Sequence, residues 1–277
     1  MTVLVTGATG LVGCHLVRLL TGPVLAVSRD PRAHPPADRV SYVDDDPAHL
    51  AGVTALFVHP RAVADPFALV ARARAAGVAK VVALSALNVD DDPADQPSRH
   101  RGDRNKEAED AVVGSGLPWV SVRAGSFASN TATAWAPQIR AGDVVRGPYA
   151  DFAEAPLDER DLAEVIAHAL TTDTLDGRRV QVTGPASHTH AELVAILGDA
   201  LGRPLRHQEV PPDQAVDGMV RAGLPAAFVH ALMDRYARGT GLPATVTGEV
   251  DEVLRRPART FAEWAADHTH LFTGARA

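Results

Sequence analysis

Three glycines near the start of the chain, Gly7, Gly10 and Gly13, have a spacing that suits phosphate binding. They follow an apolar run and precede a stretch with helical spacing, so the sequence predicts a strand, a glycine turn and a helix. In such a turn the first glycine permits the bend, the second admits a pyrophosphate, and the third allows close packing of helix and strand. The N–H groups and the dipole of the helix then favour phosphate. We therefore predict a dinucleotide site formed by Gly7, Ala8, Thr9, Gly10, Leu11 and Val12; the alternative is a structural turn that binds no ligand.

The end of the second predicted strand bears on which dinucleotide is bound. An acidic residue here would bind the ribose 2′-hydroxyl of NAD, but the chain has Ser28 and Arg29. A hydroxyl group and the forked donors of an arginine suit a 2′-phosphate, and Arg32 could assist. Asp30 weakens this argument, and Arg29 could instead be a solvent-facing charge. We expect NADP(H) to be preferred over NAD(H).

The fourth predicted strand ends in Val58 and His59. In an open parallel sheet, ligands bind outside the carboxyl ends of the strands, so we expect the backbone here to face the ribose. His59 is a candidate catalytic group as well as a cofactor contact; the alternative is a loop residue without a chemical role.

The elements that would position these residues alternate between short apolar runs and helical patterns. This order predicts an α/β fold with a doubly wound, Rossmann-type parallel sheet. The expected strands are Thr2–Thr6, Pro23–Ser28, Val40–Val43, Ala55–Val58, Lys80–Ser85, Trp119–Arg123 and Arg179–Thr183. The expected helices are Leu11–Leu20, Asp65–Ala76, Asn105–Ser115, Asp158–Leu170, which Asp158 would cap, and His190–Leu201.

We expect residues 1–190 to form the dinucleotide-binding domain, with cap insertions around 126–155. Residues 191–277 would form a smaller, mostly helical substrate or cap region. The polar stretch from Asp90 to Arg101 is predicted to be a mobile surface loop. A set of cap residues could line an apolar pocket for a flat substrate, or could simply be core: Trp135, Phe152, Phe228, Met233 and Tyr236.

Composition excludes several classes of protein. The chain has 277 residues, of which 46% are hydrophobic, and a net charge of −7, so a nucleic-acid footprint is not expected. No stretch is apolar for long enough to span a bilayer, and the N-terminus lacks the basic region of a signal peptide. Cys14 is the only cysteine, which excludes an internal disulfide and a cysteine zinc cage. We expect a cytoplasmic monomer or homodimer that has no metal site and acts on a small molecule.

The string Thr6-Gly7-Ala8-Thr9-Gly10 resembles the opening of the extended and atypical short-chain dehydrogenases/reductases. Further segments resemble one branch of them, the NmrA-like proteins. The resemblance rests on residues 80–87, on 107–130 with its segments 115–119 and 122–127, and on 158–163, 182–185 and 257–268, and so covers nearly the whole chain. Ala124 stands where that family has a proline.

The resemblance implies catalytic or cofactor-binding roles for several residues to which sequence spacing alone assigns no role. Ser85 takes the place of the family's serine and Lys106 that of its lysine, so both become candidate catalytic and cofactor-binding residues. Asp44 would approach the adenine, unless it is only one of three consecutive loop acids. The nicotinamide would meet Gly125, Ser126 and Phe127. Ser85 could instead be a polar strand end, and Lys106 an exposed lysine paired with Glu109 or Asp110.

One catalytic group is missing. Typical short-chain dehydrogenases carry a tyrosine four residues before the lysine, where it protonates the substrate carbonyl. Here that position is Gly102, and none of Tyr42, Tyr149 and Tyr236 is near it. Lys106 could therefore serve only to bind the ribose, while hydride passes to a substrate that needs little acid help. Alternatively, another acid takes the tyrosine's role, with His100, Asp103 and His59 as candidates.

The leading hypothesis is an NADPH-dependent oxidoreductase that transfers hydride to a quinone or similar conjugated small molecule, as in natural-product tailoring. A second is a non-catalytic NADP(H)-binding regulator, as the family's namesake implies, whose cap would bind a protein partner. A third is a carbonyl reductase with a substitute for the missing tyrosine.

Overall fold

The computed structural model of the protein describes residues 1–35 and 37–273. Its main sheet has seven strands in the order β3-β2-β1-β4-β5-β6-β9, and every neighbouring pair is parallel. The strands are β1 (Val3–Val5), β2 (Val24–Val27), β3 (Val40–Val43), β4 (Ala55–Val58), β5 (Lys80–Ala86), β6 (Trp119–Ala124) and β9 (Arg178–Val182). The reversal of strand order at β1 and β4 confirms the predicted doubly wound fold.

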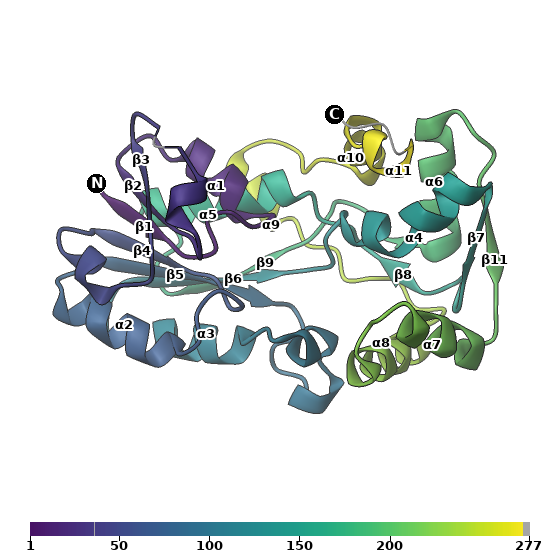
Figure 1. The fold of residues 1–277 in the computed structure, drawn as a ribbon, viewed down its shortest axis with the longest axis horizontal. Coiled ribbons are helices and arrows are strands. Elements are labelled where there is room, and N and C mark those ends of the chain that lie inside the picture. The colour runs from purple at the N-terminus through teal and green to yellow at the C-terminus, as the bar shows by residue number, and fades with distance from the viewer. Residues whose placement is uncertain (36, 274–277) are drawn as a thin grey trace.

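Helices cover both faces of this sheet (Figure 1). On one face lie α1 (Gly13–Leu19), α5 (Glu159–Thr171) and α9 (Glu249–Leu254); on the other lie α2 (Pro66–Ala75) and α3 (Asn105–Val113). Successive residues of a strand point to opposite faces. In β5, Val82 and Leu84 accordingly pack beneath the first layer, and Val81 and Ala83 beneath the second. A strand buried on both sides has to be apolar throughout, as this one is.

The predicted elements are all present, with ends that move by one or two residues. Asp158 caps α5 as expected, since its carboxylate accepts a hydrogen bond of 2.8 Å from the backbone N–H of Arg160. The stretch predicted to be a mobile loop forms two short 3-10 helices, η3 (Pro93–Asp95) and η4 (Pro97–Arg101), while η1 (Pro31–Ala33) and η2 (Pro47–Leu50) lie earlier in the chain. Gln96 anchors this segment, because its buried side-chain amide donates to the carbonyls of Val89 and Asp91.

The remaining elements form a cap beside the carboxyl ends of the strands (Figure 1). They are α4 (Asn130–Ala141), β7 (Val144–Gly147), β8 (Ala153–Glu154), β10 (His188–Thr189), α6 (His190–Leu201), β11 (Arg206–Glu209), α7 (Pro212–Arg221), α8 (Ala226–Gly239), α10 (Phe261–Asp267) and α11 (His270–Thr273). The cap has its own core, in which Trp135 packs with side chains of α6 and α10. Phe152 and Met233 are also buried, so these three residues of the expected apolar set belong to packing.

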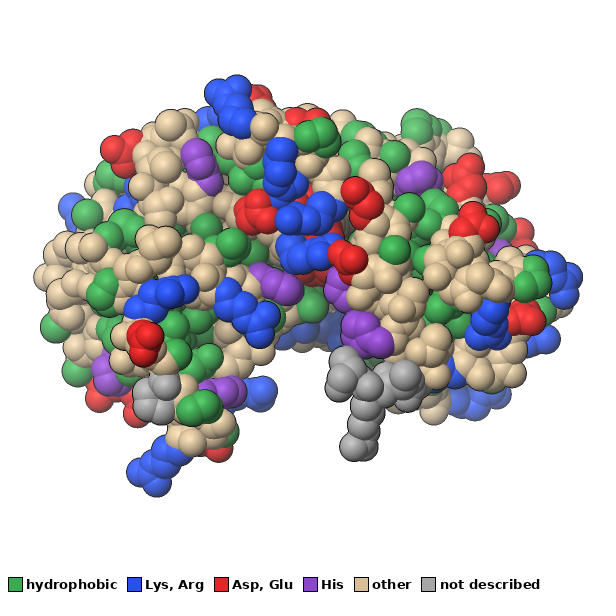
Figure 2. All heavy atoms as spheres, turned by 90° about the horizontal axis from the view of Figure 1, so that it is seen from above, with side chains coloured by type: hydrophobic (Ala, Val, Ile, Leu, Met, Phe, Trp, Pro, Cys, Tyr) green, Lys and Arg blue, Asp and Glu red, His purple; other side chains and the backbone are tan. Residues whose placement is uncertain are grey.

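The chain returns to the sheet domain after α8. Val250 and Val253 of α9 join the apolar core above the sheet. Beyond α9, Arg256 and Arg259 form ion pairs with Asp161 and Glu164 of α5. Figure 2 shows acidic and basic side chains interleaved in the middle of this face. Within the part of the chain that the structure describes, no helix has the length and apolar character needed to cross a bilayer.

Candidate functional site

The glycine turn has the geometry that the sequence predicts. Gly7 has φ +66°, in the left-handed region, and its carbonyl accepts a hydrogen bond of 3.0 Å from the N–H of Gly10. A Cβ on Gly13 would collide with the same carbonyl, so the start of α1 can approach the turn only because this residue is glycine. Thr9, Gly10 and Leu11 form an exposed tip, with Leu11 47% accessible. A glycine turn that leads into the N-terminus of a helix offers backbone N–H groups to a phosphate, as a dinucleotide site requires.

His59 lies directly against this turn. A Cβ on Gly7 would come within 2.9 Å of the His59 ring, so the His59 side chain can lie this close to the turn only because residue 7 is glycine. The backbone N–H of His59 donates to the hydroxyl of Thr6 (2.8 Å), and its Nδ1 accepts from the N–H of Arg61 (3.2 Å). Burial lowers the pKa of His59, which favours the neutral ring. Because Nδ1 accepts a hydrogen bond, the proton of the neutral ring resides on Nε2.

The residues predicted to choose the dinucleotide lie beyond β2 and β3. Ser28 is buried and its hydroxyl accepts from the N–H of Asp30 (3.2 Å), whereas Arg29 is exposed. Asp44 is bonded to the ring of His49 at 2.9 Å, and this hydrogen bond lowers the pKa of the Asp44 carboxyl. The adenine role of Asp44 stays a prediction.

Ser85 ends β5 above a buried ionic network. Its hydroxyl is buried and makes no hydrogen bond of ordinary geometry with the described residues, although it lies close enough to Glu109 to help lower the pKa of that carboxyl. Next to it, Glu109 of α3 accepts from Ser121 (2.6 Å), from Arg123 (3.0 and 2.6 Å) and from Arg179 (2.8 Å). Burial opposes the charge of Glu109, but the hydrogen bonds from Arg123, Ser121 and Arg179 outweigh it and lower its pKa to about 2. The network ties α3 to β6 and β9 beneath the site.

Lys106 and Gly102 do not share a helix. Helix α3 begins at Asn105, and Gly102, with φ +94°, ends η4 before it. Lys106 forms an ion pair with Asp110 one turn further along α3, the alternative that its helical spacing allowed. A phenol at position 102 would therefore not stand over Lys106 on one helix face.

The proposed substitute acids are held by other groups. Both carboxylate oxygens of Asp103 bind the guanidinium of Arg61 at 2.7 Å, and Nε2 of His100 is 3.0 Å from the carbonyl of Ala94. Asp103 and His59 share one neighbour in Arg61, so the charge of Asp103 partly offsets the effect of burial on the pKa of His59.

Beyond β6 the structure brings together three polar residues of which only Ser126 was predicted. Gly125 donates its N–H to the carbonyl of Val182 (2.8 Å), which holds the start of this segment against β9. The Ser126 hydroxyl then donates to Glu154 of β8 (2.6 Å) and accepts from Arg235 of α8 (3.3 Å). Phe127 follows and pairs with Leu157. No spacing in the sequence links Ser126, Glu154 and Arg235, because they come from three separate elements.

Comparison with known proteins settles the family. Residues 7–173 match the NAD(P)H-binding family. A Streptomyces griseus subsp. griseus protein named (4-alkanoyl-5-oxo-2,5-dihydrofuran-3-yl)methyl phosphate reductase is 38% identical over 98% of this chain and 99% of its own length. The chain belongs to the NmrA-like, NAD(P)H-binding branch of the atypical short-chain dehydrogenases/reductases.

Other members of the family are also reductases. An NAD(P)H azoreductase of Xenophilus azovorans is 32% identical to this NmrA-like protein over 99% of the chain and the whole of its own length. The fold agrees with that of an NADPH-dependent quinone oxidoreductase of Escherichia coli solved with NADPH, with a TM-score of 0.79 at 23% identity over 98% of this chain and 100% of that chain. The protein is an NAD(P)H-dependent oxidoreductase.

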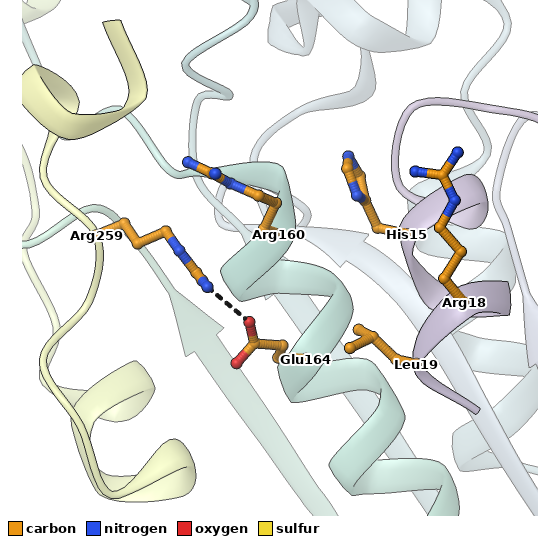
Figure 3. A pocket seen from close by; sticks show the side chains of 6 residues that line it. All are labelled: His15, Arg18, Leu19, Arg160, Glu164 and Arg259. Carbon is orange, nitrogen blue, oxygen red and sulfur yellow. Dashed lines mark hydrogen bonds and ion pairs between the residues drawn. The ribbon is translucent and has the colours of Figure 1, made fainter. Parts of the chain in front are cut away.

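A separate hollow of about 180 Å³ lies on the outer side of this reductase's sheet domain (Figure 3). Its lining comes from α1, α5 and the segment before α10, and includes Arg18, Arg160 and Arg259. Arg160 and Arg259 are already paired with acids of α5 and α10. We therefore assign this hollow to the ionic contact between α5 and the C-terminal segment. Among the described residues, no three His, Cys, Asp or Glu side chains are arranged to hold a metal ion.

Proposed function

We propose that the protein uses NADPH to reduce a conjugated small molecule, such as a quinone, by direct hydride transfer. The observation that carries this is the absence of an acid over Lys106: position 102 is a glycine outside α3, and Lys106 is paired with Asp110. An isolated carbonyl needs a proton at its oxygen as hydride arrives, because an alkoxide is a strong base. In a conjugated acceptor the incoming charge spreads over several atoms, so hydride can be accepted without a matched acid.

The names of the relatives support the same class of acceptor. One acts on a dihydrofuranone that bears an alkanoyl group and a methyl phosphate, and another on azo compounds. The structural neighbour acts on quinones. All three names describe unsaturated acceptors, and none describes a simple aldehyde or ketone.

Different residues of the site would bind different parts of the cofactor. The backbone of Ala8, Thr9, Leu11 and Val12 around Gly10 would hold the pyrophosphate, with His59 against the turn and Val58 behind it. Ser85, whose buried hydroxyl makes no hydrogen bond of ordinary geometry with the described residues, would turn from Glu109 towards the ribose side of the cofactor. Gly125, Ser126 and Phe127 would border the nicotinamide, which supplies the hydride. Lys106 would reach the ribose only by giving up Asp110.

We further propose that Ser28 and Arg29 select NADPH by binding its 2′-phosphate. Charge-assisted hydrogen bonds contribute about 1.5–3 kcal/mol each. We therefore expect Arg29→Ala to raise the Kd of NADPH about 10- to 100-fold and to leave that of NADH unchanged, as measured by fluorescence titration. Arg221→Ala, at an exposed position of α7 far along the chain, is the matched control and should change neither value. Equal NADPH affinity in Arg29→Ala would contradict the assignment.

The function itself is tested by following NADPH oxidation with a panel of acceptors. We expect turnover with benzoquinone, menadione, cyclohexenone and an azo dye, and none above background with butanal or cyclohexanone. Turnover of butanal at a rate similar to that of the quinones would favour a carbonyl reductase with a substitute acid. Silence across the whole panel would refute the proposed substrate class.

A further inference from the structure

Arg235 lies at the carboxyl end of β6 with most of its donors unused. Its Nη2 is 3.3 Å from the Ser126 hydroxyl and 3.6 Å from a Glu154 carboxylate oxygen. Among the described residues, Nη2 is the only atom of this guanidinium that makes a hydrogen bond or ion pair. The side chain is 40% exposed, so a substrate molecule can reach it. A guanidinium has five N–H donors, and Nε and Nη1 thus stay available.

The cap holds Arg235 in this place through one short strand. Phe152 lies directly before β8 and Glu154 ends it, and both side chains lie against Arg235. The guanidinium carbon stands 5.7 Å from the centre of the Phe152 ring, a distance typical of a cation–π contact, and the Glu154 carboxylate flanks it. A Cβ on Gly239 would come within 2.6 Å of the Phe152 ring, so the end of α8 can rest on that ring only because residue 239 is glycine.

Glu154 binds the Ser126 hydroxyl more closely than it binds the Arg235 guanidinium. The Ser126 hydroxyl donates to Glu154 at 2.6 Å, whereas the ion pair to Arg235 spans 3.6 Å. The carboxylate therefore fixes the direction of the serine hydroxyl and keeps the local charge balanced. Because the contact between Glu154 and Arg235 is long, the guanidinium can leave it and form a closer contact with a negative charge that develops on the substrate.

We propose that Arg235 is the group that stabilises the substrate oxyanion formed on hydride transfer, in place of the tyrosine phenol of typical short-chain dehydrogenases. This rests on the proposed function. Hydride from the reduced nicotinamide forms a C–H bond at the far end of the conjugated system, the substrate π bond breaks, and its electron pair moves to the oxygen. The nicotinamide is oxidised, the substrate is reduced to an enolate or hydroquinone anion, and water supplies the proton afterwards. Arg235 faces that oxygen from the Ser126 side.

The direct test compares Arg235→Gln with the wild-type enzyme on benzoquinone, menadione and cyclohexenone. Removal of one donor to a developing oxyanion costs about 100-fold or more in kcat, so we expect a loss of that order with cyclohexenone and an unchanged Kd for NADPH. The loss should be smaller for benzoquinone, because the oxygen it forms is less basic and needs less stabilisation. Arg235→Lys should retain an intermediate kcat, since it keeps the charge without the fork.

Two further variants separate this role from a structural one. Arg238→Gln removes an arginine of the same helix that is 54% exposed and paired with Asp95 at 3.4 Å, and should keep the wild-type kcat. In Arg235→Ala, added guanidinium chloride at millimolar concentration should restore part of the lost kcat. A kcat within twofold of wild type in Arg235→Gln, or an equal loss on all acceptors without rescue, would overturn the proposal. If the wild-type enzyme reduces none of the acceptors, the proposed function fails instead.

Discussion

We expect Gly13→Ala to raise the Kd of NADPH about 100-fold and to destabilise the fold by about 1–3 kcal/mol, the usual cost of forcing extra atoms into a packed site. The added Cβ would collide with the carbonyl of Gly7 and press on Ala8. Both contacts are backbone atoms, so no side chain can turn away. The turn or α1 has to shift, and the N–H groups that meet the phosphates shift with it. A loss of two charge-assisted hydrogen bonds is enough for a change of this size.

Calorimetric titration with NADPH and urea unfolding would measure the two effects. Gly218→Ala is the matched control, because Gly218 lies within α7 and a Cβ there meets no other described atom within 4 Å. Alanine favours a helix interior over glycine by about 1 kcal/mol. We therefore expect Gly218→Ala to bind NADPH as the wild type does and to be slightly more stable. Wild-type affinity in Gly13→Ala would show that this turn does not hold the cofactor.

The second large effect is expected for Glu109→Gln, which removes the central charge of the network beneath Ser85. Glu109 is 1% exposed and binds both Arg123 and Arg179. Its pKa falls to about 2 in the folded protein from an ordinary value of 4.5. A shift of this size corresponds to about 3 kcal/mol of stabilisation by the charged form. We expect Glu109→Gln to lose a comparable amount of unfolding free energy at pH 7.

The pH dependence of that loss has a definite sign. A depressed pKa gives stability that is complete above the unfolded value of 4.5 and is lost as the pH falls towards about 2. The difference between wild type and Glu109→Gln should therefore be constant above about pH 5.5 and shrink below pH 4.5 in urea-unfolding experiments. Glu252→Gln, an exposed partner of Arg178 at 3.4 Å, should change stability by less than about 0.5 kcal/mol. A pH-independent difference for Glu109→Gln would rule out its charge as the cause.

The network also explains why part of the site was out of reach of sequence reasoning. The sequence predicts Glu109 or Asp110 as a surface partner for Lys106, because all three lie on one predicted helix. The structure confirms the pairing with Asp110, and it turns Glu109 towards β6 and β9. Helical spacing predicts which residues share a face of the helix. It does not predict that a charged residue such as Glu109 turns towards the sheet, because the arginines that bind it there, Arg123 and Arg179, come from separate strands.

The sequence alone determined the parallel sheet, its order of elements and the glycine turn, because each depends on local spacing. Continuous apolar runs predict buried parallel strands, and the spacing of Gly7, Gly10 and Gly13 predicts a turn that no side chain could fit. Only the tertiary structure decided which side chains from distant elements meet around the site. It turned Glu109 towards the sheet, paired Lys106 with Asp110, and brought Arg235, 109 residues away in the chain, to Ser126. Contacts of this kind depend on how separate elements pack, and no periodicity in the sequence records them.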